Sequence, residues 1–114
     1  MDGCIFCKIA SKEAPSQYVH ETEYTVAFRD LNPVAPSHIL IIPKRHILNL
    51  DAASAEDATL LGEILLVAAA IARSEGFAEN GYRVVLNVGP DGGQTVGHLH
   101  AHLLAGRHLT WPPG

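Results

Sequence analysis

Three histidines at alternating positions, His98, His100 and His102, constrain the fold of this chain more than any other feature. In an α-helix, positions i, i+2 and i+4 are scattered around the cylinder, whereas in a β-strand they share one face at a spacing of about 7 Å. The intervening Leu99 and Ala101 suit the opposite, core-facing side. The pattern therefore predicts a strand that carries a row of imidazoles on one face.

Length and composition fit one soluble domain spanning residues 1–114. Of the 114 residues, 47% are hydrophobic and 18% are charged, which is enough for one hydrophobic core. The formal net charge of −4, with no run of Lys and Arg, argues against nucleic acid as a partner. The N-terminus lacks the pattern of a secretory signal, and the longest apolar run, 64–72, is too short to span a bilayer. We therefore expect a cytoplasmic protein with no membrane partner.

Hydrophobic patterning and turn residues predict an α+β fold: a five-stranded antiparallel sheet with one long helix and a short N-terminal helix. Short turns separate the candidate strands, and the histidine segment supplies the last of them. The ranges are 4–12 for the short helix, 18–20, 24–29, 38–42 and 81–88 for the other strands, and about 54–75 for the long helix.

The long helix has clear end signals. Ser54 and Asp57 resemble a capping box, and Gly76 suits a left-handed residue after the last turn. Between residues 60 and 72 only Gly62 and Glu63 are not aliphatic, which is more apolar surface than one sheet face covers. A homodimer would cover the excess, and loops of the same chain are the alternative.

Two chemical interpretations of the histidine row remain open from spacing alone. Three imidazoles can hold a catalytic zinc ion that activates water. Alternatively, His100 itself attacks phosphorus while its neighbours bind the phosphoryl oxygens, because neutral imidazole is abundant near pH 7 and a P–N bond to it is labile. The preceding Gly93-Gln94-Thr95 turn is either a plain hairpin turn or a set of N–H groups and side chains that face a phosphate.

Two further groups of residues are candidates for a site. Asp30 starts a turn or accepts the hydroxyls of a ribose, and Phe6, Phe28 and Leu31 would form an apolar slot for a base, although taken alone they fit a core better.

Cys4 and Cys7 have the C-x-x-C spacing of a metal pair, a redox pair or two buried thiols. A metal would need two more ligands, for which His46 is available.

Taken together, these stretches resemble the histidine triad family, in its nucleotide-binding branch. The resemblance rests on the segment Gly97-His98-Leu99-His100-Ala101-His102 and extends over most of the chain. The other matching stretches are 5–9, 27–30, 35–38, 42–46, 81–85, 91–94 and the tail 111–114.

The resemblance implies a homodimeric histidine-triad fold that binds purine mononucleotides such as AMP conjugates. It also implies a purine nucleoside phosphoramidase that cleaves the P–N bond of adenosine 5′-phosphoramidates without a catalytic metal. His100 would become the nucleotidyl-histidine. The other roles that it implies are carried by His38, His98 and His102 around the phosphate, Asn87, Gly93, Gln94 and Thr95 at phosphoryl oxygens or the leaving amine, Asp30 at the ribose, Phe6, Phe28 and Leu31 at the base, and Trp111 at the leaving group in the partner's site.

The cysteines depart from the best-known animal members of this branch, which lack them. In many bacterial relatives the pair resembles a structural zinc site, which here implies zinc bound by Cys4, Cys7, His46 and His98. Gly97 also replaces an aromatic residue that is frequent in the branch, and Val88-Gly89-Pro90 differs from the usual sequence, so the width of the leaving-group pocket differs too.

Two alternatives accompany the phosphoramidase. One is a dinucleoside-polyphosphate hydrolase, the activity of a sister branch, against which the tail at 111–114 argues. The other is a zinc-stabilised, nucleotide-binding interaction protein with little turnover. The physiological leaving group and the preference for adenine or guanine are not encoded in any motif that we recognise.

Overall fold

Five antiparallel strands form one sheet in the order β1-β2-β3-β5-β4. The computed structural model of the chain describes residues 3–114. The strands are β1 (Tyr18–Glu21), β2 (Thr25–Arg29), β3 (Ser37–Pro43), β4 (Tyr82–Val85) and β5 (Ala101–Ala105), and the helices are α1 (Ile5–Ala10) and α2 (Ala58–Ser74), with short 3₁₀ turns at Leu50–Ala52 and Ala55–Asp57. The predicted α+β fold, with its five-stranded sheet and two helices, is confirmed.

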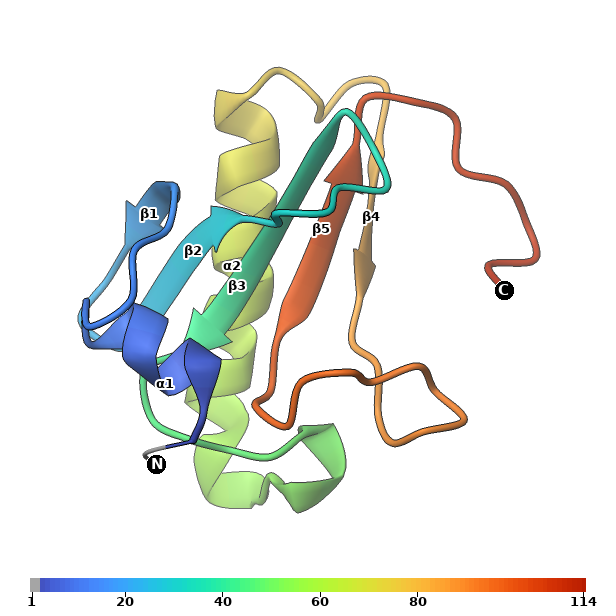
Figure 1. Cartoon of the computed structure of the whole chain (residues 1–114). Coiled ribbons are helices and arrows are strands. Elements are labelled where there is room, and N and C mark those ends of the chain that lie inside the picture. Colours follow the sequence, from blue (N-terminus) through green and yellow to red (C-terminus); the bar gives the residue numbers. More distant parts are fainter. Residues whose placement is uncertain (1–2) are drawn as a thin grey trace.

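The two helices lie on opposite faces of the sheet (Figure 1). The long helix α2 packs across β3, β4 and β5, whereas α1 packs on the other face near β3. The central strand β3 is buried along its whole length, because its alternate side chains point to opposite faces of the sheet and pack into a core on each face. Ile39 and Ile41 join the core under α2, and Leu40 and Ile42 join a second core with Phe6 of α1.

The end signals of α2 are confirmed. Ser54 and Asp57 form the capping box, which encloses a 3₁₀ turn before the α-helix begins at Ala58. The helix ends at Ser74, and Gly76 has a φ of +85°, a conformation that suits glycine. None of the helices in residues 3–114 combines the length and the apolar character needed to cross a bilayer.

The predicted histidine strand is shorter than its sequence pattern. Strand β5 begins at Ala101, so His98 and His100 precede it and His102 lies within it. The reason is that the N–H of Leu99 donates to the Ile47 carbonyl in the loop after β3, at 2.6 Å, rather than to a neighbouring strand. The alternation of faces nevertheless holds, because Leu99 and Ala101 lie in the core under α2.

Strand β4 is also shorter than predicted, ending at Val85 instead of residue 88. Val85 pairs with His102, and only Ala101 of β5 lies beyond that pair, so residues 87 and 88 have no strand opposite them.

Leu103 provides a test of the core under α2. It is 1% exposed and lies opposite Ile39 on one neighbouring strand and Val84 on the other. We expect Leu103→Ala to lower the free energy of unfolding by about 2–5 kcal/mol, because it leaves a cavity. Denaturant unfolding measures this value, with the half-exposed Leu50→Ala as a control expected to lose less than about 1 kcal/mol. Equal losses in the two variants would contradict this packing.

Candidate active site and metal cluster

The tautomer of His100 is fixed by a backbone carbonyl. Its Nδ1 lies 2.7 Å from the main-chain oxygen of His98. A carbonyl oxygen only accepts hydrogen bonds, so Nδ1 carries the proton and the neutral ring has its lone pair on Nε2. An imidazole with a free Nε2 lone pair has the form required of a nucleophile.

His100 lines a cavity of about 350 Å³ beside α1. The aromatic rings of Phe6 and Phe28 meet edge to face at 5.5 Å, and Phe6 makes a second edge contact with His100 at 5.1 Å. Asp30 and Leu31 line the same cavity, and the Leu31 side chain is 88% exposed at its rim. The fold therefore gathers the predicted base and ribose residues around His100.

His38 and His102, which lies next to His100, form a hydrogen bond whose donor and acceptor can be assigned. The Nε2 atom of His38 lies 2.9 Å from Nδ1 of His102. The N–H of Val34 donates to Nδ1 of His38 at 3.1 Å, so that nitrogen has the lone pair and Nε2 carries the proton. His38 therefore donates to His102, and His102 in turn carries its own proton on Nε2.

Burial keeps both of these histidines neutral. Burial, with smaller effects of His100 and His38, lowers the pKa of His102 to about 4. Burial also lowers the pKa of His38, against the opposing effect of Asp30. The Asp30 carboxylate lies 3.4 Å from Nε2 of His38, and at neutral pH this contact joins a carboxylate to an N–H group rather than two ions.

The Gly93-Gln94-Thr95 turn is tied together internally. The N–H groups of Gly93 and Gln94 donate to the carbonyls of Pro90 and Gly89. The Gln94 side chain makes four further hydrogen bonds within the protein. These groups thus hold the shape of the turn, and Thr95 is its member that lines the cavity.

Asn87 supports the same turn. Its side-chain amide donates to the Gly92 carbonyl at 2.7 Å. A Cβ atom at Gly92 would lie 2.3 Å from the Val88 oxygen, so only glycine fits there.

Two other positions of the sequence analysis lie apart from the cavity lining. Trp111 is 81% exposed and is absent from the lining residues, so it does not contribute to the cavity of its own chain. At Gly97 a Cβ would come within 3.2 Å of the Leu48 side chain, so a larger residue there would have to displace Leu48.

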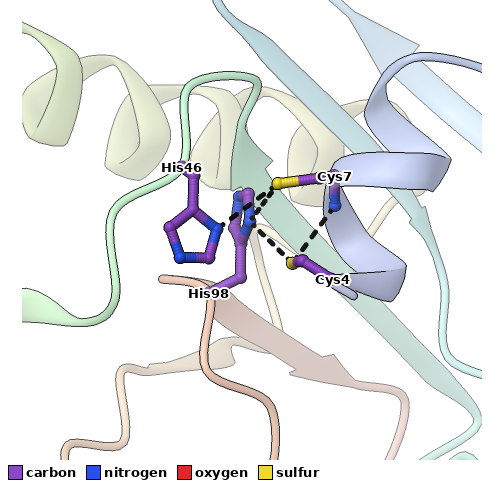
Figure 2. Close-up of side chains that lie close together, drawn as sticks. All are labelled: Cys4, Cys7, His46 and His98. Atoms are coloured by element: carbon purple, nitrogen blue, oxygen red, sulfur yellow. Dashed lines mark hydrogen bonds between the residues drawn. The ribbon is translucent and has the colours of Figure 1, made fainter. Parts of the chain in front are cut away.

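The four predicted metal ligands converge (Figure 2). Cys4 and Cys7 come from the start of α1, His46 from the loop after β3 and His98 from the segment before β5. Their ligand atoms all lie within 4.8 Å of one another.

The spacing and the tautomer both fit a tetrahedral zinc ion. The sulfur of Cys7 lies 3.3 Å from Nδ1 of His46 and 3.5 Å from Nδ1 of His98, while Cys4 lies 3.3 Å from the latter. Zinc–sulfur and zinc–nitrogen bonds at tetrahedral angles place these atoms about 3.6 Å apart. His98 Nε2 lies 2.9 Å from the Pro43 carbonyl and must donate to it, which leaves the Nδ1 lone pair facing the sulfurs.

A second group, Asp30, His38 and His102, also has ligand atoms within 4.8 Å of one another. In this group the nitrogen that would have to bind a metal carries a proton, because Nε2 of His38 is an N–H group that donates to His102. Histidine therefore takes part in a hydrogen-bond chain in this cluster, whereas in the other cluster it offers a lone pair that could bind a metal.

Comparisons with known proteins agree on one family. The HIT domain model matches residues 11–109. An uncharacterized HIT-like protein of Synechococcus elongatus is 57% identical over 113 residues, covering 99% of this chain and 98% of that protein. The 14 kDa zinc-binding protein of Zea mays is 53% identical over 112 residues, covering 96% of this chain and 87% of that protein.

Among solved structures, a HIT family hydrolase from Legionella pneumophila Philadelphia 1 matches with a TM-score of 0.97 at 51% identity, covering 98% of this chain and 100% of that one. A histidine triad protein from Clostridium difficile matches with a TM-score of 0.93 at 49% identity, covering 96% and 95% of the two chains.

The neutral state of His102 is directly testable. Because its pKa in the folded protein, about 4, lies below the ordinary value of 6.5, folding favours the unprotonated ring. This contribution to stability is complete above about pH 6.5 and is lost as the pH falls through 4. Nitrogen NMR of labelled histidine should show a neutral His102 ring at pH 6, with the signal assigned by a His102→Asn variant. A ring that is half protonated near pH 6.5 would contradict its buried placement.

Proposed function

Because the chain belongs to the HIT domain family, we propose that it is a nucleotide hydrolase of the histidine triad type, specifically a purine nucleoside phosphoramidase. One observation carries this proposal: the His98 carbonyl holds the proton of His100 on Nδ1, which leaves a nucleophilic Nε2 in a ring that lines the cavity. The Legionella relative is named a hydrolase, which agrees with this class of reaction.

The proposed reaction has two displacements at the α-phosphorus. In the first, a bond forms between His100 Nε2 and phosphorus while the P–N bond of the substrate breaks, and the leaving nitrogen takes a proton from solvent to become a free amine. In the second, water attacks phosphorus, the bond to His100 breaks and water releases its proton. The products are the amine, AMP and the original enzyme.

The His98 carbonyl would stabilise the positive charge of the intermediate. When Nε2 of His100 bonds to phosphorus, the ring becomes cationic while its Nδ1–H stays against the His98 carbonyl. That hydrogen bond strengthens as the charge develops, which lowers the barrier.

The remaining groups of the cavity fit a purine nucleotide. The apolar walls made by Phe6, Phe28 and Leu31 would hold the base, and the Asp30 carboxylate at the rim would accept the ribose hydroxyls. Thr95 and the Nε2–H of His102 would donate to phosphoryl oxygens, with Asn87 and Gln94 keeping the turn in shape.

We propose that Cys4, Cys7, His46 and His98 hold zinc. All four tetrahedral positions would be filled by protein, so zinc would supply a structural cross-link between α1, the loop after β3 and the His98 segment, and no water-activating role. The name of the maize relative, a zinc-binding protein, agrees with this set. As a ligand, His98 would stay neutral and would not protonate the leaving group.

A homodimer is also part of the proposal. Leu66 of α2 is 72% exposed beside a shallow groove, and β4 is an edge strand of the sheet. Burying both against a second copy would cover apolar surface and an unpaired strand edge. In such a dimer Trp111 would lie in the partner's site, in keeping with its exposure in a single chain.

The proposed zinc site also fits a cytoplasmic location, because thiols stay reduced there and remain able to bind zinc.

The nucleophile is tested by trapping the intermediate. We expect the parent protein, mixed with an AMP–amine conjugate and quenched in base, to carry one AMP by intact mass. His100→Ala should carry none, and its turnover should fall at least about a thousand-fold, about 4 kcal/mol in activation free energy, because the covalent route is gone.

The matched control is His20→Ala on β1, an exposed histidine remote from the cavity. Unchanged turnover in His100→Ala would contradict the proposal. Faster turnover of diadenosine polyphosphates than of AMP–amine conjugates would favour the sister-branch activity, and tight binding with no turnover of either would favour an interaction protein.

Metal analysis tests the zinc proposal. The purified chain should contain one zinc ion, and a strong chelator should lower its free energy of unfolding by about 2 kcal/mol or more, because the ion binds only the folded state. Cys7→Ser should lose the metal, whereas His20→Asn should keep it. Zinc retained in full by a Cys4→Ser, Cys7→Ser double variant would assign the metal to other residues.

A further inference from the structure

The side chains of Asp30, His38 and His102 form a chain that leads from the lining of the cavity to the ring next to His100. The carboxylate oxygen Oδ2 of Asp30 lies 3.4 Å from Nε2 of His38, and that nitrogen lies 2.9 Å from Nδ1 of His102. His38 is almost fully buried, whereas Asp30 keeps contact with the cavity.

Two neighbouring groups favour the same tautomer of His38, with the proton on Nε2. The Val34 N–H donates to Nδ1, which therefore needs a lone pair. On the other side the Asp30 carboxylate faces Nε2, where a negative charge favours a proton and disfavours a lone pair. Asp30 itself is fixed, because its Oδ1 accepts from the Asn32 N–H at 2.8 Å and its own N–H donates to the His38 carbonyl.

This pattern determines what His102 presents to a substrate. With the proton of His38 on Nε2, the neutral His102 must use Nδ1 as acceptor and carry its proton on Nε2. Flipping one ring alone would place two lone pairs or two protons face to face across 2.9 Å, and flipping both rings would turn an Nδ1–H of His38 against the Val34 N–H. The adjacent His100 ring, whose centroid is 4.9 Å from that of His102, has the opposite tautomer, with its proton on Nδ1 and its lone pair on Nε2.

We propose that Asp30 is a positioning residue for phosphoryl chemistry: through His38 it holds His102, whose ring neighbours that of His100, as a neutral Nε2–H donor. This role is separate from any bond to ribose, and it rests on the proposed function. It makes Asp30 the link between the sugar end of the cavity and the groups that stabilise charge on the phosphoryl oxygens.

The test separates this role from ribose binding by removing the hydroxyls. Asp30→Asn keeps the side-chain shape and removes the charge, and the substrates are an AMP–amine conjugate and its 2′,3′-dideoxy analogue. We expect Asp30→Asn to lower kcat about tenfold on both substrates, because the Nε2–H form of His38, and with it the Nε2–H form of His102, then depends on the Val34 N–H alone. A carboxylate that only binds ribose would leave turnover of the dideoxy analogue unchanged, and this result would overturn the proposal.

A double-mutant cycle shows whether Asp30 acts through His38. In a His38→Gln background, the further change Asp30→Asn should have little effect on kcat with the dideoxy analogue, because the link is already broken. Full additivity of the two changes would contradict the proposed route. Glu21→Gln on β1 serves as the charge control, because it removes a carboxylate that pairs with Lys12 and Lys44 and does not line the cavity.

Nitrogen NMR provides a readout that needs no turnover. In the parent protein His102 should show an unprotonated Nδ1 and a protonated Nε2, and Asp30→Asn should shift both signals toward a mixture of tautomers. If the protein hydrolyses no phosphoramidate, the proposed function fails while this measurement still decides the role of Asp30. Identical His102 signals in parent and variant would reject the positioning role.

Discussion

The hydrogen bond from His100 to the backbone carbonyl of His98 is the interaction on which the proposed chemistry depends. It determines which nitrogen of the central imidazole is free, and a ring in the other tautomer would turn an N–H toward phosphorus. The carbonyl is held in place because His98 is itself fully buried and bonded to the Pro43 carbonyl. One residue thus anchors the proposed nucleophile through its backbone and completes the proposed zinc set through its side chain.

The two histidine clusters show that residue type alone does not decide chemistry. His98 and His46 turn nitrogens toward two sulfurs, and in His98 a carbonyl on the far side of the ring leaves the near nitrogen free to bind a metal. In His38 a backbone N–H has the opposite effect, so the near nitrogen becomes a donor to His102. Neutral histidine has one donor and one acceptor, so a group bound at one nitrogen limits the role of the other, and in His38 the Val34 N–H and the Asp30 carboxylate favour the same arrangement.

The two faces of the sheet have different tasks: one packs into the main core, and the other carries the histidines. On the α2 face, Leu99, Ala101 and Leu103 pack into the main core, while the intervening histidines lie on the face that α1 covers. The α1 segment contributes to both, because Phe6 packs against His100 and the two cysteines of the same segment face His46 and His98. A zinc ion in that cluster would therefore also fix the α1 wall of the cavity that His100 lines.

The sequence by itself determined the fold class, the capping of the long helix and the alternation of faces around the histidines, because these follow from local periodicity and from capping chemistry. The four converging ligands were named through the resemblance to the histidine triad family, since spacing alone left the role of the cysteine pair open. Only the tertiary structure decided where β5 begins, which groups of the Gly93-Gln94-Thr95 turn remain available, and how each histidine is protonated. The partners responsible are backbone groups of Val34, Pro43, Ile47 and His98, and because every residue carries the same backbone N–H and C=O, no sequence motif marks the ones that the fold brings to a ring.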